Sequence, residues 1–409
     1  MNTELIKELT KYYHDITPED VVGVSYGKKE IGGKLTDIDA VIFTVIKKKP
    51  LDEIPTDEII PSTIEFKGFN FETDVEEGEY LFLEDCPSDF YDWITTPPAN
   101  RNEIRPLQGG ISTTNYTSLN TSTGTLGFLA VDSQTNSLVG VSNNHVYVYD
   151  AFQANERSAS GQKTSILNNI VTQPNESGNS GLQNAIGLVK RYVPLSGTSY
   201  YNSVDCALTT VNEDDVDNSV SYRQYGMTGW LAPLEFATTS EIDNLLSTNP
   251  NLFSSGRTTG PKGEGDMKLF ADASSVITIA YKKQGTPTYV YFEDNIRFYA
   301  SASTTPSGYV CTYPIAPGDS GSALVADFGG TRKIIGLVFA GLNYNGSTIR
   351  GLANRIDNVV NQIGISAWTG QTVNYSNTGV TETHIVSGLS DIPYMDLSGN
   401  TYWQGGLSS

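Results

Sequence analysis

The chain has 409 residues, of which 38% are hydrophobic, and its 46 acidic and 26 basic side chains give a formal net charge of −20. This length and apolar content allow two or three domains, each with its own buried core. A charge of this sign repels phosphate backbones, so nucleic acid is excluded as an expected partner.

The cysteines (Cys86, Cys206 and Cys311) are too few and too scattered for a disulfide framework, which favours a reducing compartment. The N-terminus lacks the apolar core of a signal peptide, and no stretch is long enough to span a membrane. We therefore expect a cytoplasmic protein with no membrane partner, although export by a non-standard route stays open. No metal-ligand spacing or phosphate loop is present, so we expect neither a metal nor a cofactor.

Residues 1–96 are predicted to form a small α+β domain. An amphipathic pattern predicts a helix over residues 2–14. Alternating segments at 21–29 and 40–49, joined by a Gly-Gly turn, predict a hairpin, and a further strand is expected at 62–69. The second of these segments ends in three lysines, which are interpreted as a solvated strand end rather than a binding patch.

A proline-containing segment at 95–106 is predicted to be a linker. From 107 to 365 short strands and turns alternate, which is typical of β-barrels or a sandwich. Short helices are expected from Ser240, taken as an N-cap, and from Ile356. The polar tail, 366–409, could form an extra hairpin or an arm that packs on a neighbouring subunit.

The segment around Ser320 reads Pro-Gly-Asp-Ser-Gly-Ser. A serine hydroxyl becomes a nucleophile only with a base beside it and with donors aimed at the oxyanion that forms. Glycines on both sides of the serine allow such a turn, and the N–H groups of Gly318 and Ser320 are the natural donors. The alternative is a polar turn between two strands.

Only three histidines are available as the base. His14 lies in the predicted N-terminal helix and His384 in the polar tail. His145 ends an apolar strand where a loop begins, which is where a catalytic imidazole is expected. The alternative is a partly buried histidine at a strand end.

The third member of such a site is a buried carboxylate that orients the imidazole. Asp205 stands directly before an apolar run, and an acid beside buried residues needs a partner. It could otherwise simply begin a strand. Asp132 is a weaker candidate because it belongs to a predicted hairpin turn and is expected to be solvated.

These three segments resemble those of trypsin-like serine peptidases. The similar stretches are Asn-Asn-His145, Asp205-Cys-Ala-Leu and Gly318-Asp-Ser-Gly321, in the order histidine, aspartate, serine. The resemblance implies a mainly β fold with two six-stranded antiparallel barrels, about 107–215 and 216–365, preceded by the small α+β domain.

Further likenesses concern the substrate pocket and the branch of the family. Gly336–Gly341 is similar to the strand that lines the specificity pocket, and the segment from Gly351 is similar to the segment that closes it. Gly256-Arg-Thr-Thr-Gly260, the N-terminal domain and the segment from Arg105 resemble a bacterial branch related to the plant narrow-leaf proteins.

The resemblance also implies which residues form the pocket. They are Pro314, Ile315, Phe339, Ala340, Gly341 and Gly351. Trypsin's pocket acid is replaced by Pro314, so we expect an open slot for a small to medium apolar side chain. Arg350 near the mouth could instead favour acids. Cys311 is expected at the base of the pocket, and Cys206 in the core.

Secreted relatives are activated by cleavage, and the new amine then pairs with the aspartate before the serine. Here Arg105 is followed by proline, which blocks ordinary tryptic cleavage. We therefore expect Asp319 to find an internal partner, with no cleavage required.

The sequence thus predicts a serine endopeptidase that hydrolyses protein or peptide substrates through an acyl-enzyme on Ser320. The alternative is a catalytically silent peptidase-fold protein with a structural or assembly role. In either case the N-terminal domain or the tail is expected to support a homo-oligomer.

Overall fold

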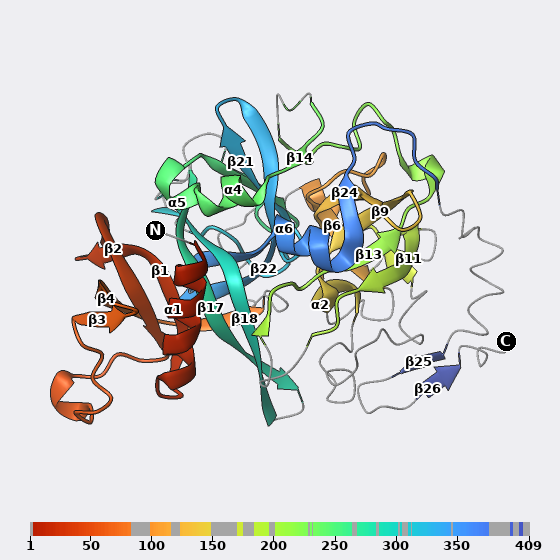
Figure 1. Ribbon diagram of the computed structural model, residues 1–409. Coiled ribbons are helices and arrows are strands. Elements are labelled where there is room, and N and C mark those ends of the chain that lie inside the picture. The colour runs from red at the N-terminus through yellow and green to blue at the C-terminus, as the bar shows by residue number, and fades with distance from the viewer. Residues whose placement is uncertain are drawn as a thin grey trace.

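The protein, seen here as a computed structural model, is built mainly from strands (Figure 1). The structure describes residues 3–82, 99–115, 123–148, 170–174, 184–195, 201–227, 230, 232–263, 268–283, 286–301, 303–304, 310–311, 313–344, 347–375, 393–395 and 401–403. Cys86, His384 and the start of the predicted linker lie outside them. No helix among the described residues is long and apolar enough to cross a membrane.

Six strands close into a ring in the second half of the chain. Around the ring, each strand pairs antiparallel with the next, and the last pairs again with the first. In ring order they are β15 (Leu252–Gly256), β17 (Leu269–Lys283), β18 (Thr286–Ala300), β23 (Ser347–Arg355), β22 (Thr331–Tyr344) and β21 (Ala323–Phe328).

A second curled sheet precedes this ring in the sequence. Its antiparallel order is β24 (Ile365–Ala367), β8 (Phe128–Asp132), β9 (Ser137–Ser142), β13 (Ala207–Thr210), β11 (Ala185–Tyr192), β10 (Ile170–Thr172), β6 (Ile111–Asn115) and β7 (Gly124–Leu126). Only Gly127 separates β7 from β8, so the row returns on itself. β24 adds to the free edge of β8, and with β7 and β8 counted as one bent strand the other members form a six-stranded half-barrel, so the predicted fold class is confirmed.

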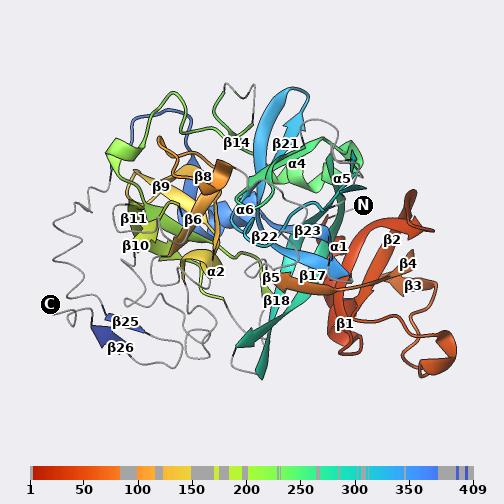
Figure 2. The same ribbon diagram turned by 180° about the vertical axis from the view of Figure 1, so that it is seen from behind.

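The N-terminal unit is joined to the second barrel by strand pairing. It comprises α1 (Thr3–Ile16), β1 (Val21–Ile31), β2 (Lys34–Val45), β3 (Thr63–Phe66), β4 (Phe69–Glu77) and β5 (Glu79–Phe82). β1 pairs antiparallel with β17 in the register Gly23↔Ile277 to Gly27↔Ala273, so the barrel sheet continues into this unit. Figure 2 shows the same continuity from behind.

One element of this unit differs from the expectation. The stretch predicted as a single strand at 62–69 is a tight hairpin, in which β3 and β4 meet at Lys67 and Gly68. Both residues have positive φ, 49° and 82°, which reverses the chain. The Lys-Gly pair inside an apolar pattern was the available turn signal.

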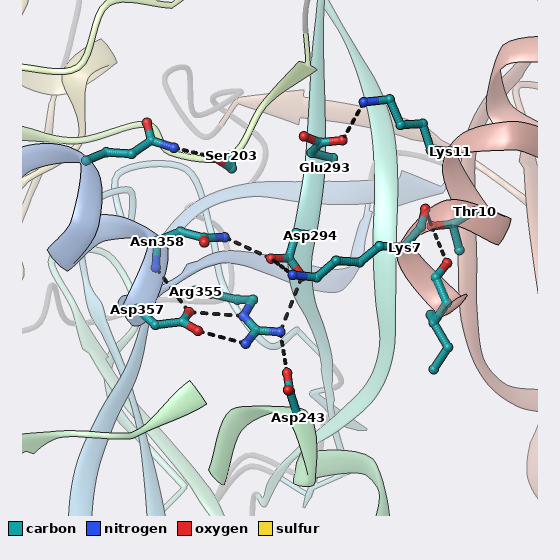
Figure 3. A network of polar contacts seen from close by, with 12 residues as sticks. Lys7, Thr10, Lys11, Ser203, Asp243, Glu293, Asp294, Arg355, Asp357 and Asn358 are labelled. Atoms are coloured by element: carbon teal, nitrogen blue, oxygen red, sulfur yellow. Dashed lines mark hydrogen bonds and ion pairs between the residues drawn. The ribbon is translucent and has the colours of Figure 1, made fainter. Parts of the chain in front are cut away.

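Ion pairs fix α1 to the second barrel (Figure 3). Lys7 Nζ lies 2.7 Å from Asp294 Oδ2, and Lys11 Nζ lies 3.0 Å from Glu293 Oε2. Arg355 meets Asp294 from the barrel side, with 3.3 Å between Nη1 and Oδ1. The helix is therefore attached at a point where the barrel strands are themselves cross-linked by charge.

His14 adds a neutral hydrogen-bonded contact on the same helix. Its Nδ1 lies 2.7 Å from the Tyr201 hydroxyl, and its Nε2 lies 2.8 Å from Thr278 Oγ1 of β17. Burial lowers the pKa of His14 from 6.5 to about 4, against the opposing effect of Asp15. The imidazole is therefore neutral in the folded protein at neutral pH.

We expect His14 to make stability depend on pH between about 4 and 6.5. In this window the unfolded chain binds a proton that the folded chain does not, so stability rises with pH and is lost on acidification. The full effect is up to about 3 kcal/mol. Unfolding midpoints measured across this range should fall less steeply for His14→Gln, and parallel profiles for the two proteins would contradict the assignment.

The remaining elements are short. The helix expected from Ser240 begins earlier, because Thr238 is its N-cap and forms a capping box with Glu241. The helix expected from Ile356 is confirmed, and the hairpin considered for the tail is present as β25 and β26. The other bounds are η1 Leu51–Glu53, β5 Glu79–Phe82, η3 Ala99–Arg101, α2 Asn144–Tyr147, β12 Tyr201–Asn202, η6 Glu213–Asp215, β14 Glu235–Phe236, α4 Thr239–Asp243, α5 Leu245–Thr248, β16 Gly260–Lys262, β19 Ser303–Thr304, β20 Val310–Cys311, α6 Ile356–Val359, η7 Val360–Gly364, β24 Ile365–Ala367, β25 Pro393–Met395 and β26 Thr401–Trp403.

Candidate functional site

His145 and Asp205 form a buried pair in the first barrel. His145 lies in the single helical turn α2, directly after β9, and its Nδ1 is 2.5 Å from Asp205 Oδ2. The backbone N–H of His145 also donates to Asp205 Oδ1 at 3.2 Å. Both side chains are fully buried. A carboxylate in this position holds the imidazole in one orientation and favours its Nδ1–H tautomer.

Neighbouring backbone and amide groups hold Asp205 in place. Its N–H donates to Asn354 Oδ1 at 2.9 Å, and its carbonyl accepts from Asn143 Nδ2 at 2.8 Å. Directly after it, β13 pairs with β9 through Ala207↔Ser142. Asn354 belongs to β23 of the second barrel, so it links the two barrels through the backbone N–H of Asp205. Sequence reasoning did not identify this residue.

The loop of Ser320 extends from the second barrel onto the first. The Ser320 carbonyl accepts from the N–H of Thr125 at 2.7 Å, and the Gly318 carbonyl accepts from Thr125 Oγ1 at 2.9 Å. A Cβ at Gly124 would lie 2.5 Å from Val146 and 3.0 Å from the Ser320 carbonyl. The serine loop and the turn that carries His145 therefore meet at one glycine, which has no side chain to separate them.

The Ser320 hydroxyl donates to the Phe339 carbonyl at 3.4 Å, and the residue is fully buried. It makes no hydrogen bond to His145 in this conformation, in the described part of the chain. Polar atoms of a nucleophile and its base are often loosely aligned until substrate binds. The structure therefore places the three predicted residues in one region at the contact between the barrels.

The serine loop contains N–H groups that are bonded and N–H groups that are available as donors. The N–H groups of Asp319 and Gly321 are bonded to the carbonyls of Ala316 and Val338, at 2.9 and 2.8 Å. Among the described residues, the N–H groups of Gly318 and Ser320 meet no acceptor. Gly318 has a φ of +92°, and a Cβ there would lie 2.5 Å from Thr258 Oγ1. The predicted oxyanion donors are therefore free to bind an incoming oxygen.

Asp319 has the internal partners that the sequence predicted. Its Oδ1 accepts from the N–H groups of Thr258 and Thr259 at 2.8 and 3.1 Å. Its Oδ2 accepts from the Thr259 hydroxyl at 2.6 Å and from the Ala316 N–H at 2.9 Å. A Cβ at Gly256 would lie 2.3 Å from this carboxylate, so that glycine makes room for it. The segment Gly256–Gly260 thus satisfies Asp319 without a new N-terminus.

We expect Asp319→Ala to lower the free energy of unfolding by about 2–4 kcal/mol, because it leaves buried N–H groups without their charged acceptor. Denaturant titration of the purified chain measures the change. Asp327→Asn, a partly exposed carboxylate on the hairpin between β21 and β22, is the control and should change the value by less than about 0.5 kcal/mol. Equal effects would show that the carboxylate is not needed to order the loop.

The predicted pocket residues lie on three segments, and among them Phe339 contacts Ser320, whose hydroxyl donates to its carbonyl. Phe339, Ala340 and Gly341 belong to β22, Gly351 belongs to β23, and Pro314 and Ile315 are buried before the serine loop. A Cβ at Gly351 would lie 2.4 Å from the Phe298 ring, so an aromatic side chain already borders that glycine. The expected preference for an apolar side chain stays a prediction.

Two expectations about charged residues need correction. Arg350 is held by Asp272 (2.6 Å) and Glu30 (3.0 Å), so its charge is already matched by acids rather than offered to a substrate. Asp132 is fully buried rather than solvated, with Lys190 and Arg191 at 2.8 and 2.9 Å. Burial opposes its ionisation, but these donors hold its pKa below the usual range. Asp132 is therefore not the partner of His145, because its carboxylate pairs with Lys190 and Arg191 instead.

The core prediction for Cys206 is confirmed, because this thiol is fully buried and burial raises its pKa well above the usual value. Cys311 lies in β20, and its side chain is outside the described part. Phe82 was not identified from the sequence, yet its ring centroid is 5.0 Å from that of His145. Its only local signal was the apolar run Tyr-Leu-Phe at the end of the N-terminal unit.

No family model matches the chain, and no curated protein matches it. Solved structures with a similar course are serine proteases. Thermobifida fusca protease A is 15% identical with a TM-score of 0.37, and the match covers 64% of this chain and 98% of that chain. Nocardiopsis protease is 18% identical with a TM-score of 0.37, and the match covers 64% of this chain and 99% of that chain. Cellulomonas bogoriensis chymotrypsin is 16% identical with a TM-score of 0.36, and the match covers 64% of this chain and 98% of that chain. Function is therefore inferred from the site itself, and the relation to the narrow-leaf branch stays a prediction.

Proposed function

We propose that the protein is a serine endopeptidase that cleaves peptide bonds through an acyl-enzyme on Ser320. The observation that carries the proposal is the buried His145–Asp205 pair, 2.5 Å apart, beside a serine loop with two free N–H donors. A buried carboxylate, an imidazole, a serine and N–H donors for the oxyanion are the groups that acyl transfer requires.

In the proposed reaction, each of these groups has one role. His145 Nε2 takes the proton as Ser320 Oγ forms a bond to the substrate carbonyl carbon, while Asp205 stabilises the imidazolium through Nδ1. The carbonyl oxygen becomes an oxyanion that accepts from the N–H groups of Gly318 and Ser320. The C–N bond then breaks, with His145 returning the proton to the leaving amine. Water repeats the sequence on the ester and releases the acid.

Covalent labelling tests this proposal. A fluorophosphonate probe, incubated with the whole chain, should form an adduct on Ser320 that mass spectrometry of peptides locates. Ser320→Ala should abolish the adduct. Ser322→Ala is the matched control, because this nearby serine bonds to Ser254 instead and should leave labelling intact. No adduct on Ser320 after prolonged incubation, in both the wild type and Phe82→Asp, would contradict the proposal and leave the peptidase fold as a scaffold.

A further inference from the structure

A strand from the N-terminal unit lies on the free edge of β22. β21 covers β22 only as far as Leu337, and beyond that point β5 pairs with β22 antiparallel. The paired residues are Ala340↔Phe82, Gly341↔Leu81, Leu342↔Tyr80 and Asn343↔Glu79. The edge beside the serine is therefore filled by an extended segment of this same chain.

The register of this strand is directed at the candidate site. Phe82 pairs with Ala340, the neighbour of Phe339, whose carbonyl accepts from Ser320. Because the pairing is antiparallel, β5 runs toward the serine as the chain proceeds. The Phe82 ring contacts the His145 ring at 5.0 Å, and both His145 and Ser320 are buried.

Adding a strand to an exposed sheet edge is a general way to bind an extended peptide, in which backbone groups supply affinity and alternate side chains supply specificity. We propose that β5 is an internal, substrate-like strand that occupies the peptide-binding edge of β22 and restricts access to Ser320. This inference rests on the proposed peptidase function. It assigns the edge a ligand class, an extended peptide with an aromatic side chain facing His145.

The rings around Phe82 favour an aromatic side chain at this position of the bound strand. Its ring centroid lies 6.0 Å from that of Phe292 and 6.4 Å from that of Phe339, and these two rings are 4.7 Å apart. Together with His145 they form an aromatic surface, on which a flat apolar ring packs favourably in edge-to-face geometry. A charged side chain at this position would lose that packing and would be desolvated.

Tyr80 anchors β5 to β1 and β2 of the N-terminal unit. It is fully buried, and its hydroxyl lies 3.0 Å from Thr44 Oγ1 of β2. A Cβ at Gly23 would lie 2.6 Å from the Tyr80 ring, so the glycine in β1 makes the space for it. Because β5 is tethered in this way, its effective concentration at the edge reaches the millimolar range, and modest intrinsic affinity suffices for occupancy.

Weakening the strand should expose the serine. In Phe82→Asp, we expect the second-order rate of fluorophosphonate labelling at Ser320 to rise by about tenfold or more, since the tethered occupant is lost. Phe69→Asp is the matched control, because Phe69 belongs to the same unit but is 54% exposed and remote from β22 pairing. It should label at the wild-type rate. Equal rates for the wild type and Phe82→Asp would overturn the proposal.

A disulfide that holds β5 on β22 tests the opposite effect, a slower labelling of Ser320, and does not require a disruptive substitution. Glu79 and Asn343 are paired residues, so Glu79→Cys with Asn343→Cys should form a disulfide that fixes β5 on the edge. The oxidised protein should label at least about fivefold more slowly than the reduced one, with the wild type insensitive to the same reductant. Equal rates before and after reduction would also overturn the proposal. If no variant labels at all, the peptidase function itself fails, which is a distinct result.

Discussion

Asp205→Asn is expected to lower kcat/KM for peptide hydrolysis by about four orders of magnitude while the chain stays folded. The amide of asparagine is neutral, so it cannot stabilise the imidazolium that forms when His145 takes the proton of Ser320. It also presents an NH2 group where Nδ1–H now meets Oδ2 at 2.5 Å, which favours the wrong tautomer. The loss therefore arises in the transition state rather than in substrate binding.

The measurement is steady-state hydrolysis of an extended aromatic peptide by the whole chain, in the wild-type background and with Phe82→Asp. Asp132→Asn is the control, since it also removes a buried carboxylate of the first barrel but one paired with Lys190 and Arg191. It should keep its activity below its own unfolding temperature. A loss of less than about tenfold in Asp205→Asn would remove this residue from the proposed mechanism.

Arg297→Met is expected to lower the free energy of unfolding by about 3–5 kcal/mol, because it breaks a buried network of ion pairs. Arg297 is 1% exposed; its Nε lies 3.1 Å from Asp272 Oδ1, and its guanidinium also pairs with Glu76 of β4. Burial opposes the ionisation of Asp272, but Arg297 and Arg350 hold its pKa below the usual value. The substitution leaves that buried carboxylate only partly compensated.

Denaturant unfolding followed by fluorescence measures this loss. Lys28→Met is the control, because Lys28 forms an exposed ion pair with Asp39 that contributes at most about 1 kcal/mol. Since Glu76 belongs to the N-terminal unit and Asp272 to β17, the Arg297 variant should also loosen the contact between that unit and the barrel. A midpoint shift no larger than that of the control would contradict the role given to the pair.

The sequence signals that point to the candidate site are local. Gly318-Asp-Ser-Gly321 marks a turn, His145 follows an apolar strand and Asp205 precedes one, and each feature is visible within a few residues. The internal partner of Asp319 was predicted for a similar reason, since the proline after Arg105 argued against a new N-terminus.

What the sequence did not predict depends on contacts between distant segments. The pairing of Phe82 with Ala340 and the link from Asn354 to Asp205 join residues far apart in the chain, and no local periodicity encodes either one. The burial of Asp132 was missed because a turn position alone predicts solvation. By contrast, the N-cap at Thr238 was readable from the Thr-x-x-Glu pattern that ends at Glu241.

The pairing of β1 with β17 has a consequence for how the chain avoids aggregation. Residues Ala273–Ile277 of β17 are covered on one side by β18 and on the other by β1. A chain lacking the N-terminal unit would present this stretch as a bare strand edge, which is a template for pairing with other molecules. We therefore expect the N-terminal unit to keep this edge from pairing with other molecules, independently of any effect of β5 on Ser320.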